Sequence, residues 1–318
     1  MVRADSPRPL MSYAVAAVRA DSPRPLMSYA VAALRADSPP LNCYSGNSMP
    51  YRLLALDLDG TLLRSDHSVD PRDIAAIREL QAAGVTVTIV TGRLQSGATD
   101  AARACAIEGT IACVEGSHLV ELATNTTVAH HAMTGDVTQL LRETITRHGL
   151  AGFVFDAQGI HHDHAASPYA DYVKTWSPNL RVVEEDLAWQ TRPLAAVAIG
   201  DADAVAAAHA VLRQHADQLF SVSFAVSMCP GKHAVLVRAA GPSKGTALAE
   251  LCRVAGCSLA EAVAVGDWVN DIPMFEVAGR SFAMGSSPEH VRSKATDSLE
   301  TQAGAGGGIA EAIRRAWG

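Results

Sequence analysis

The chain has 318 residues, 48% of them hydrophobic and 19% charged, which is typical of a globular protein with a sizeable core. Its formal net charge of −7 and pI of about 5.9 argue against nucleic acid or an anionic membrane surface as a partner. No uninterrupted apolar run approaches the roughly 18 to 20 residues that span a bilayer, so a membrane-embedded protein is excluded from our expectations.

The first forty residues contain a near-identical repeat, with RADSPRPLMSYAVAAV at Arg3–Val18 followed by RADSPRPLMSYAVAAL at Arg19–Leu34. A period of sixteen fits no solenoid, and short apolar pieces broken by charge and proline bury too little surface to order a chain. We interpret residues 1–48 as a mobile extension and Met49 as the natural start of the folded chain. The alternative is that PLMSYAVAAV forms short helices that dock on the core or on another subunit.

Downstream of the extension, predicted strands alternate with predicted helices. The apolar run before DLDGT predicts a buried strand over 52–57, and DPRDIAAIRELQAAG predicts a helix with Asp70 as its N-cap and Pro71 at its first position. VTVTIVTGR predicts a second buried strand, which is followed by a helix over 94–105 and a third strand over 110–116. This alternation predicts a parallel sheet in a doubly wound α/β fold.

The pattern then changes and later returns. A helix over 136–148, short strands, a His-rich stretch and a long Ala-rich helix over 202–219 are predicted next. The strand–helix rhythm resumes with SKGTALAELCRVAG and AVAVG, and a last helix is predicted over 309–317. We therefore predict a discontinuous Rossmann-like core with an inserted α/β cap domain, the core comprising residues 49–131 and 240–318 and the cap residues 132–239.

The six cysteines are scattered, without CxxC spacing or the dense framework of a small secreted domain. Such usage is typical of reduced, partly buried thiols, and it predicts a cytoplasmic location. No zinc site is expected among Cys43, Cys105, Cys113, Cys229, Cys252 and Cys257.

Side chains that carry chemistry gather at the ends of the predicted parallel strands, where such sheets bind their ligands. Asp57 and Asp59 follow the first strand and, because side chains alternate along a strand, they point to the same side. The other candidates follow the second strand, follow AVAVG, or open a helix, and they are Thr91, Gly92, Arg93, Asp267, Asn270, Asp271 and Lys244.

The charges of these candidates do not balance. Like charges about 4 Å apart repel by about 4 kcal/mol per pair at an effective dielectric of about 20. The four acids face only Lys244 and, at most, Arg93, so either they are solvated at a loop or a cation lies between them. Oxygen ligands alone suit Mg²⁺, and we predict Mg²⁺ among Asp57, Asp59, Asp267 and Asp271.

The segments DLDGTLL, VTGR, SKGTAL and GDWVNDIPM, in that order, resemble the four motifs of the haloacid dehalogenase superfamily of phosphohydrolases. The large insert and the ending FAMGSSPEHVRSKATDSL resemble its Cof-type branch, which has a C2 cap; the similarity covers about residues 51–318. The resemblance implies a Mg²⁺-dependent phosphatase of a small phosphorylated metabolite, such as a sugar phosphate, that works through an aspartyl-phosphate.

The resemblance also implies roles for the matching residues. Asp57 would be the nucleophile, and Asp59 would protonate the leaving oxygen and then activate water. Mg²⁺ would be held by the Asp57 carboxylate, the Asp59 main-chain carbonyl and Asp267, with Asp271 and Arg93 in support. The residues left to bind or fix the phosphoryl group would be Thr91, Gly92, Lys244 and Asn270.

Two features lie outside this pattern. Relatives usually have an Asn-Gly-Ala turn after the third strand, and Glu115 replaces the Asn here, which would put an extra acid near the cap hinge or the substrate rim. In the cap, His161, His162 and His164 could hold a second metal, but we favour a polar loop that faces the active site and selects substrate.

Other functions stay open at this point. A phosphotransferase or phosphomutase would use the same aspartyl-phosphate, and a non-catalytic regulator could keep the fold. The oligomeric state is not legible in the sequence.

Overall fold

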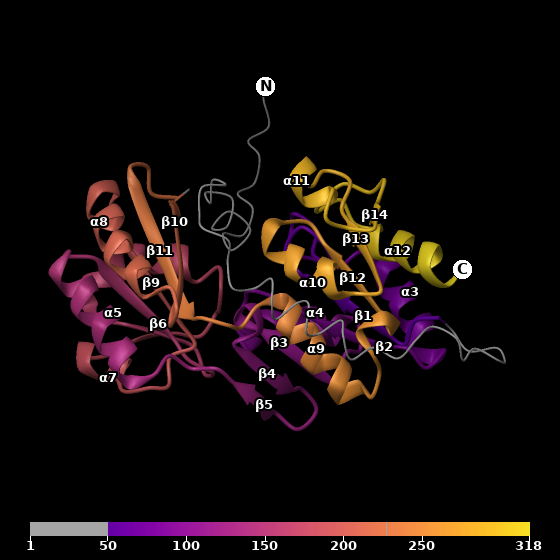
Figure 1. Ribbon diagram of the computed structural model, residues 1–318, viewed down its shortest axis with the longest axis horizontal. Coiled ribbons are helices and arrows are strands. Elements are labelled where there is room, and N and C mark those ends of the chain that lie inside the picture. The colour runs from indigo at the N-terminus through magenta and orange to yellow at the C-terminus, as the bar shows by residue number, and fades with distance from the viewer. Residues whose placement is uncertain (1–49, 227) are drawn as a thin grey trace.

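A computed structural model describes residues 50–226 and 228–318, and the chain folds into two α/β units (Figure 1). The interpretation of residues 1–48 as a mobile extension, and of Met49 as the start of the fold, concerns residues outside the described ones.

The core contains a five-stranded sheet in the order β14-β13-β12-β1-β2, and every neighbouring pair is parallel. This confirms the doubly wound fold that the strand–helix alternation predicts. The central strand β1 pairs with β2 on one side and with β12 on the other, although these come from opposite ends of the sequence. The bounds are β1 Leu53–Leu56, β2 Thr86–Ile89, β12 Ala262–Gly266, β13 Arg280–Ala283 and β14 Asp297–Ser298.

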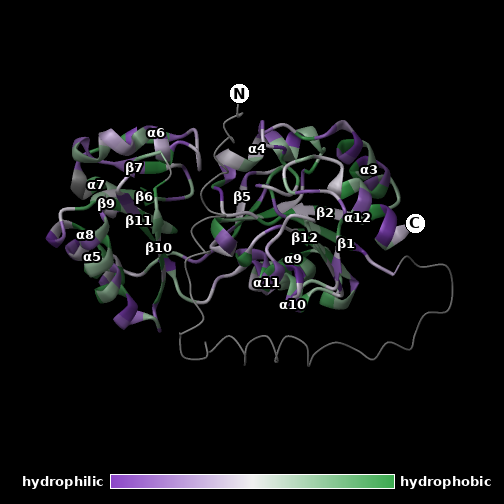
Figure 2. Ribbon diagram, turned by 90° about the horizontal axis from the view of Figure 1, so that it is seen from above, coloured by the Kyte–Doolittle hydropathy of each residue, from purple (hydrophilic) through white to green (hydrophobic). Residues whose placement is uncertain are grey.

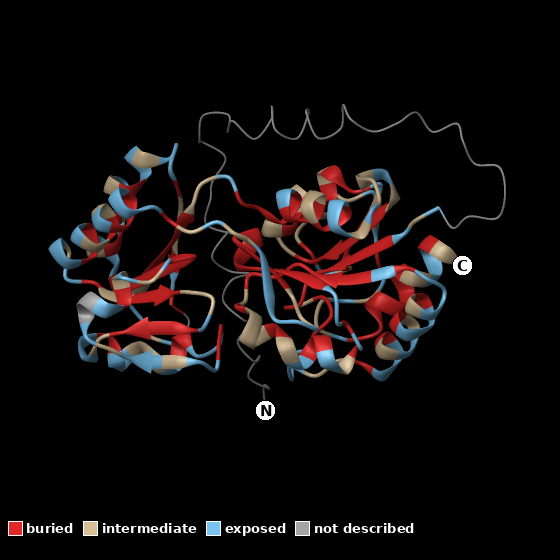
Figure 3. Cartoon of the chain, turned by 90° about the horizontal axis from the view of Figure 1, so that it is seen from below, coloured by how far each residue is buried: buried red, intermediate tan, exposed pale blue. Residues whose placement is uncertain are grey.

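Helices cover both faces of this sheet because successive residues of β1 point in opposite directions. Leu54 and Leu56 pack in one cluster with residues of α3 (Pro71–Ala82) and α12 (Gly308–Trp317). Leu53 and Ala55 pack in another with residues of α9 and α10. Figures 2 and 3 show the apolar, buried strands between the helices. Helix α9 comprises Lys244–Ala255 and helix α10 comprises Ile272–Val277. The other two helices of the described core are α4, Gln95–Ala104, and α11, Glu289–Arg292.

The third predicted strand is shorter than expected and mostly serves another sheet. β3 (Thr110–Cys113) meets β2 through a single parallel bridge and pairs in antiparallel fashion with β4 (His118–Glu121), which pairs with β5 (Thr126–His130). The prediction over 110–116 is wrong beyond Cys113 because Val114 and Glu115 adopt left-handed backbone angles, which end a strand.

The inserted cap contains a six-stranded sheet in the order β10-β11-β9-β6-β7-β8, mainly antiparallel, with α5 and α8 packed on one face. Its elements are α5 Gly135–Arg147, β6 Ala151–Phe155, β7 Ile160–His162, α6 Ala170–Val173, β8 Leu180–Val182, α7 Glu185–Trp189, β9 Ala195–Asp201, α8 Ala202–Leu212, β10 Leu219–Ala225 and β11 Lys232–Ala239.

The Ala-rich helix predicted over 202–219 is too long. It ends at Leu212, a short 3₁₀ turn covers Arg213–His215, and Leu219 already belongs to β10. Every residue of β10, Leu219–Ala225, pairs with β11, and this tertiary pairing overrides the helical propensity of the segment.

Two short connections join cap and core, one between β5 and α5 and the other between β11 and α9. The predicted boundaries before residue 132 and after residue 239 fall at these connections and stay predictions. None of the helices in the described part of the chain has the length and hydropathy to cross a membrane.

Candidate active site

The first acidic pair lies at the carboxyl end of β1, as its position after an apolar strand predicts. Asp57 and Asp59 are both buried, with 5% and 8% of their surface exposed. Gly60 follows with a left-handed φ of +84°, and a Cβ atom there would lie 2.3 Å from Oδ2 of Asp267. The turn after β1 therefore needs glycine so that the Asp267 carboxylate can approach the main chain.

A buried ion triad forms the centre of the site. Nζ of Lys244 donates to Oδ1 of Asp57 at 2.5 Å and to Oδ1 of Asp271 at 2.6 Å. Lys244 is fully buried at the first position of α9, where the helix dipole disfavours a cation. The two carboxylates compensate for that position, so this lysine stays in the interior because of its partners.

The pKa shifts of this triad follow from burial and from the neighbouring charges. Burial raises the pKa of Asp57 well above its usual value, against the effect of Lys244, and the acids around it raise it further. Burial alone would lower the pKa of Lys244, but the carboxylates of Asp271 and Asp57 raise it above its usual value. Lys244 therefore stays positively charged. Its single charge does not neutralise all of the acids around it.

The loop after β12 supplies the other two acids. Oδ2 of Asp271 accepts hydrogen bonds from the main-chain N–H groups of Asp267 at 2.8 Å and Trp268 at 2.9 Å. This fixes the loop and directs Oδ1 of Asp271 at Lys244. A Cβ atom on Gly266 would lie 2.4 Å from Cγ of Asp271, so the loop also needs glycine at the end of β12.

The donor set fits a divalent metal ion. One carboxylate oxygen from each of Asp57, Asp267 and Asp271 lies within 4.8 Å of the other two. Each of the three side chains is buried. Hard oxygen donors of this kind suit Mg²⁺. The charge imbalance that the sequence predicts is present in three dimensions.

Asp59 is directed away from this triad. Its two carboxylate oxygens accept from Nε and Nη2 of Arg93, at 2.8 and 2.5 Å, in a bidentate pair. Nη1 of Arg93 donates to the carbonyl oxygen of Gly97 in α4. On the sequence alone, the positive charge of Arg93 is set against all four acids. In the structure this charge is paired with Asp59.

The loop after β2 lies beside the segment that follows β1, on the side away from β12. Thr91 and Gly92 are buried, and Oγ1 of Thr91 accepts from the main-chain N–H of Arg93 at 3.1 Å. Thr91 also holds the neighbouring turn, because its carbonyl oxygen accepts from the N–H of Glu115 at 3.0 Å. Thr91 and Gly92 thus lie just after the strand that pairs with β1, the strand that leads to Asp57.

Glu115 and Asn270 form a contact that the sequence did not reveal. Nδ2 of Asn270 donates to Oε1 of Glu115 at 2.9 Å. Glu115 is 8% exposed and has a left-handed φ of 56°. Its charge is close enough to raise the pKa of Lys244.

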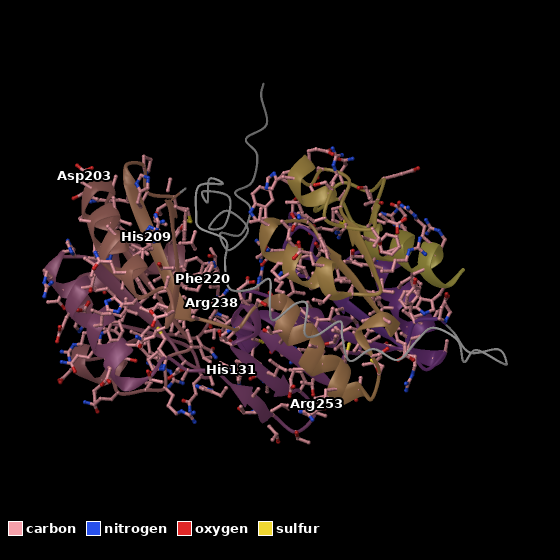
Figure 4. The ribbon with its side chains drawn as sticks, in the orientation of Figure 1. His131, Asp203, His209, Phe220, Arg238 and Arg253 are labelled. Atoms are coloured by element: carbon pink, nitrogen blue, oxygen red, sulfur yellow. The ribbon has the colours of Figure 1, made fainter. Side chains whose placement is uncertain are left out.

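The charge of Glu115 also acts on a buried arginine of the cap, Arg238. Arg238, at the end of β11, stacks over the ring of Phe220 at 4.2 Å, and Nη1 donates to the carbonyl oxygen of Pro242 at 2.5 Å (Figure 4). Burial lowers the pKa of Arg238 to about 10, and Glu115 partly opposes that shift. The only sequence signal for this residue is a lone arginine after the apolar run AVLV.

The His-rich stretch of the cap is not a loop, so that interpretation is wrong. His161 and His162 lie in β7, where alternation sends them to opposite faces. Nε2 of His161 bonds Oδ2 of Asp156 at 2.9 Å, whereas His162 packs on Phe153. His164 starts the next 3₁₀ turn, and in the described residues no metal-ligating group contains any of these histidines.

A cavity of about 1550 Å³ lies beside the two cap connections, lined by α5, the segment after α7 and residues such as His131, Arg192 and Ala240. It contains none of the motif residues. We assign the chemistry to the edge of the core sheet instead, because the buried carboxylates and Lys244 converge there.

Comparison with known proteins agrees with this geometry. A family model described as haloacid dehalogenase-like hydrolase matches residues 54–313. The chain belongs to this family. It is 28% identical over 257 residues to pyridoxal phosphate phosphatase YbhA of Escherichia coli (strain K12), covering 78% of this chain and 92% of that protein. It is 25% identical to 5-amino-6-(5-phospho-D-ribitylamino)uracil phosphatase YwtE of Bacillus subtilis (strain 168), covering 77% and 91%.

The fold of this hydrolase has a close counterpart among solved structures. A haloacid dehalogenase-like hydrolase from Bacteroides thetaiotaomicron matches with a TM-score of 0.72 and 23% identity, covering 83% of this chain and 99% of that one. The cytoplasmic location stays a prediction.

Proposed function

We propose that this hydrolase is a Mg²⁺-dependent phosphatase of small phosphorylated metabolites that acts through an aspartyl-phosphate on Asp57. The observation that carries the proposal is the buried triad of Asp57, Lys244 and Asp271 at the end of a parallel strand, with Asp267 beside it. A site of this kind unites a nucleophile, a fixed cation and the oxygen donors for a metal.

Asp57 would attack phosphorus in line with the leaving oxygen and take the phosphoryl group as a mixed anhydride. Lys244 now holds Oδ1 of Asp57, which leaves Oδ2 as the candidate attacking atom. Because Lys244 is clamped between two carboxylates, it would also meet a phosphoryl oxygen with little reorganisation. Thr91 and Gly92, on the neighbouring strand end, are the candidates for a second phosphoryl contact, and Asn270 for a third at the Glu115 side.

Asp59 would move the protons of both half-reactions. In the first it would give a proton to the leaving oxygen, and in the second it would take one from the attacking water. Arg93 occupies both carboxylate oxygens of Asp59, so proton donation requires Asp59 to turn from Arg93 towards the substrate. Arg93 would thereby hold Asp59 in a resting orientation between turnovers.

The Asp57 carboxylate, the Asp59 main-chain carbonyl and Asp267 would hold Mg²⁺. When bound, it would supply the positive charge that this cluster of acids lacks and would neutralise charge on the transferring phosphoryl group. Asp271 would hold the Lys244 side chain and the loop at Asp267 in place relative to each other.

For the substrate, two curated relatives support a small phosphorylated metabolite, because their names give pyridoxal phosphate and a phosphoribitylaminouracil. The cap would act as lid and specificity pocket. Sugar phosphates are the substrate class that we would test first, since one of those substrates carries a phosphorylated sugar alcohol.

The test is release of inorganic phosphate from a panel that contains pyridoxal 5′-phosphate, hexose and pentose phosphates and a phosphorylated sugar alcohol. We expect release with Mg²⁺ and loss of at least a hundredfold with excess chelator, restored by added Mg²⁺. A parallel assay for phosphoryl transfer to added sugars would detect a transferase instead. Full release in excess chelator would contradict the metal assignment.

A further inference from the structure

The C-terminal end of α9 brings two cysteines together that are five residues apart in sequence. Gly256 adopts a left-handed φ of 64°, its N–H donates to the carbonyl oxygen of Arg253 at 3.3 Å, and the N–H of Cys257 donates to that of Cys252 at 3.0 Å. These two bonds define a Schellman motif. In this motif the side chains at the two ends of the longer bond are frequently in contact, and here both are thiols.

The two thiols differ in exposure and in charge. Cys252 is 2% exposed and packs in the apolar cluster between α9 and the core sheet, whereas Cys257 is half-buried. Interaction between the two thiols lowers the pKa of Cys257 and raises that of Cys252. Burial and the carboxylate of Glu261 raise the pKa of Cys257 in part, and Arg52, whose Nη1 donates to the carbonyl oxygen of Gly256 at 2.9 Å, lowers it.

The other described cysteines lack this arrangement. Cys105 and Cys113 are buried in the core, and burial raises the pKa of their thiols to about 11 and about 12. Cys229 is half-buried and forms no disulfide with another described cysteine. An accessible thiol of lowered pKa beside a second thiol is the arrangement that oxidises reversibly.

We propose that Cys257 and Cys252 form a redox-active dithiol, with Cys257 as the peroxide-reactive thiol and Cys252 as its resolving partner. The Cys257 thiolate attacks hydrogen peroxide, the O–O bond breaks, and sulfenic acid and hydroxide form. The Cys252 sulfur then attacks the sulfenic sulfur and displaces hydroxide, which leaves as water with the Cys252 proton. In sum, two thiols are oxidised to one disulfide and one peroxide is reduced to two waters.

The disulfide should form without disturbing the catalytic end of the helix. Lys244 lies at the first residue of α9, while Arg253, labelled in Figure 4, marks the opposite end. The cross-link closes a short loop that the Schellman bonds already hold, so it should restrict the unfolded chain more than the folded one. This inference is independent of the proposed phosphatase activity.

The experiment exposes the full chain to hydrogen peroxide, blocks remaining thiols with N-ethylmaleimide and digests the protein with trypsin. Because Arg253 lies between the two cysteines, cleavage there separates them, and a disulfide appears as two peptides joined by one bond. We expect this linked pair, its loss on treatment with dithiothreitol, and a melting temperature a few degrees higher in the oxidised protein.

Cys257→Ser should abolish the linked pair, and Cys229→Ser, the matched half-buried control, should leave it unchanged. If Cys252→Ser fails to fold, Cys252→Ala serves instead, and Cys257 should then oxidise onward to sulfinic acid. The proposal is overturned if peroxide converts wild-type Cys257 to sulfinic acid while Cys252 remains open to alkylation, or if Cys257 reacts no faster than Cys229.

Discussion

The two sheets of this hydrolase distribute their charges differently. In the core sheet all five strands run in the same direction, so residues that follow separate strands, such as Asp57, Thr91 and Asp267, meet at one edge. The cap sheet is mainly antiparallel, and its charged side chains form separate local contacts such as His161 with Asp156 and Lys232 with Asp201. Parallel topology thus concentrates charge where antiparallel topology disperses it.

That difference makes the core edge the part of the protein where single substitutions should matter most. Asp57→Asn should reduce kcat more than about a thousandfold, because the amide is not a nucleophile. The melting temperature of the metal-free variant should stay equal to or exceed that of the wild type, since one of three crowded acids loses its charge. Steady-state phosphate release and thermal unfolding measure both; substantial remaining turnover would remove Asp57 from its assigned role.

A buried cation at the core edge should be essential for stability. Lys244→Met removes the partner of two buried carboxylates, and breaking such a contact costs about 3 to 5 kcal/mol of unfolding free energy. Millimolar Mg²⁺ should restore part of this loss by replacing the missing charge. Urea unfolding with and without Mg²⁺ tests this, with the exposed Lys174→Met of the cap as the matched control. Equal stability of the two variants would contradict the comparison of core and cap.

Acid should destabilise the protein through a third region, the β3–β4–β5 hairpins. Burial lowers the pKa of His118 to about 4, so between that value and its ordinary pKa of about 6.5 the unfolded state binds more protons. Stability therefore falls as pH decreases through this window, by up to about 3 kcal/mol from this residue. His118→Gln should lose less stability than wild type between pH 7 and pH 4.5; identical pH profiles in thermal melts would show that His118 does not carry the effect.

Replacement of Arg238, the buried cation of the cap, should have the smallest effect on the free energy of unfolding. Arg238 forms no ion pair with a described carboxylate, and its bonds go to main-chain carbonyls of the linker. Arg238→Met should therefore cost about 1 kcal/mol, the net value of ordinary hydrogen bonds, and change kcat less than KM. Urea unfolding beside Lys244→Met provides the comparison, and a loss as large as that of Lys244→Met would mean that Arg238 has a charged partner in solution.

The core edge was predictable because each of its residues follows a recognisable strand or opens a capped helix. Asp57, Lys244 and Asp271 occupy the positions that their sequence context predicts, and the structure brings them into contact. The contacts of Glu115 with Asn270 and of Cys252 with Cys257 were not predictable, because they depend on the left-handed backbone at Glu115 and Gly256. The length of α8 was missed because pairing of β10 with β11 overrides local propensity.

The central position of β1 has a consequence for how the protein is made. One neighbour, β2, is synthesised soon afterwards, but the other, β12, begins at Ala262, about 200 residues after Leu53. At about 5 to 20 residues per second, a ribosome needs roughly 10 to 40 s to supply it. During that time one edge of an entirely apolar strand has no partner, while the whole cap has already emerged. A growing chain of this protein should therefore depend on chaperones most strongly before its last fifth, which begins with β12, is translated.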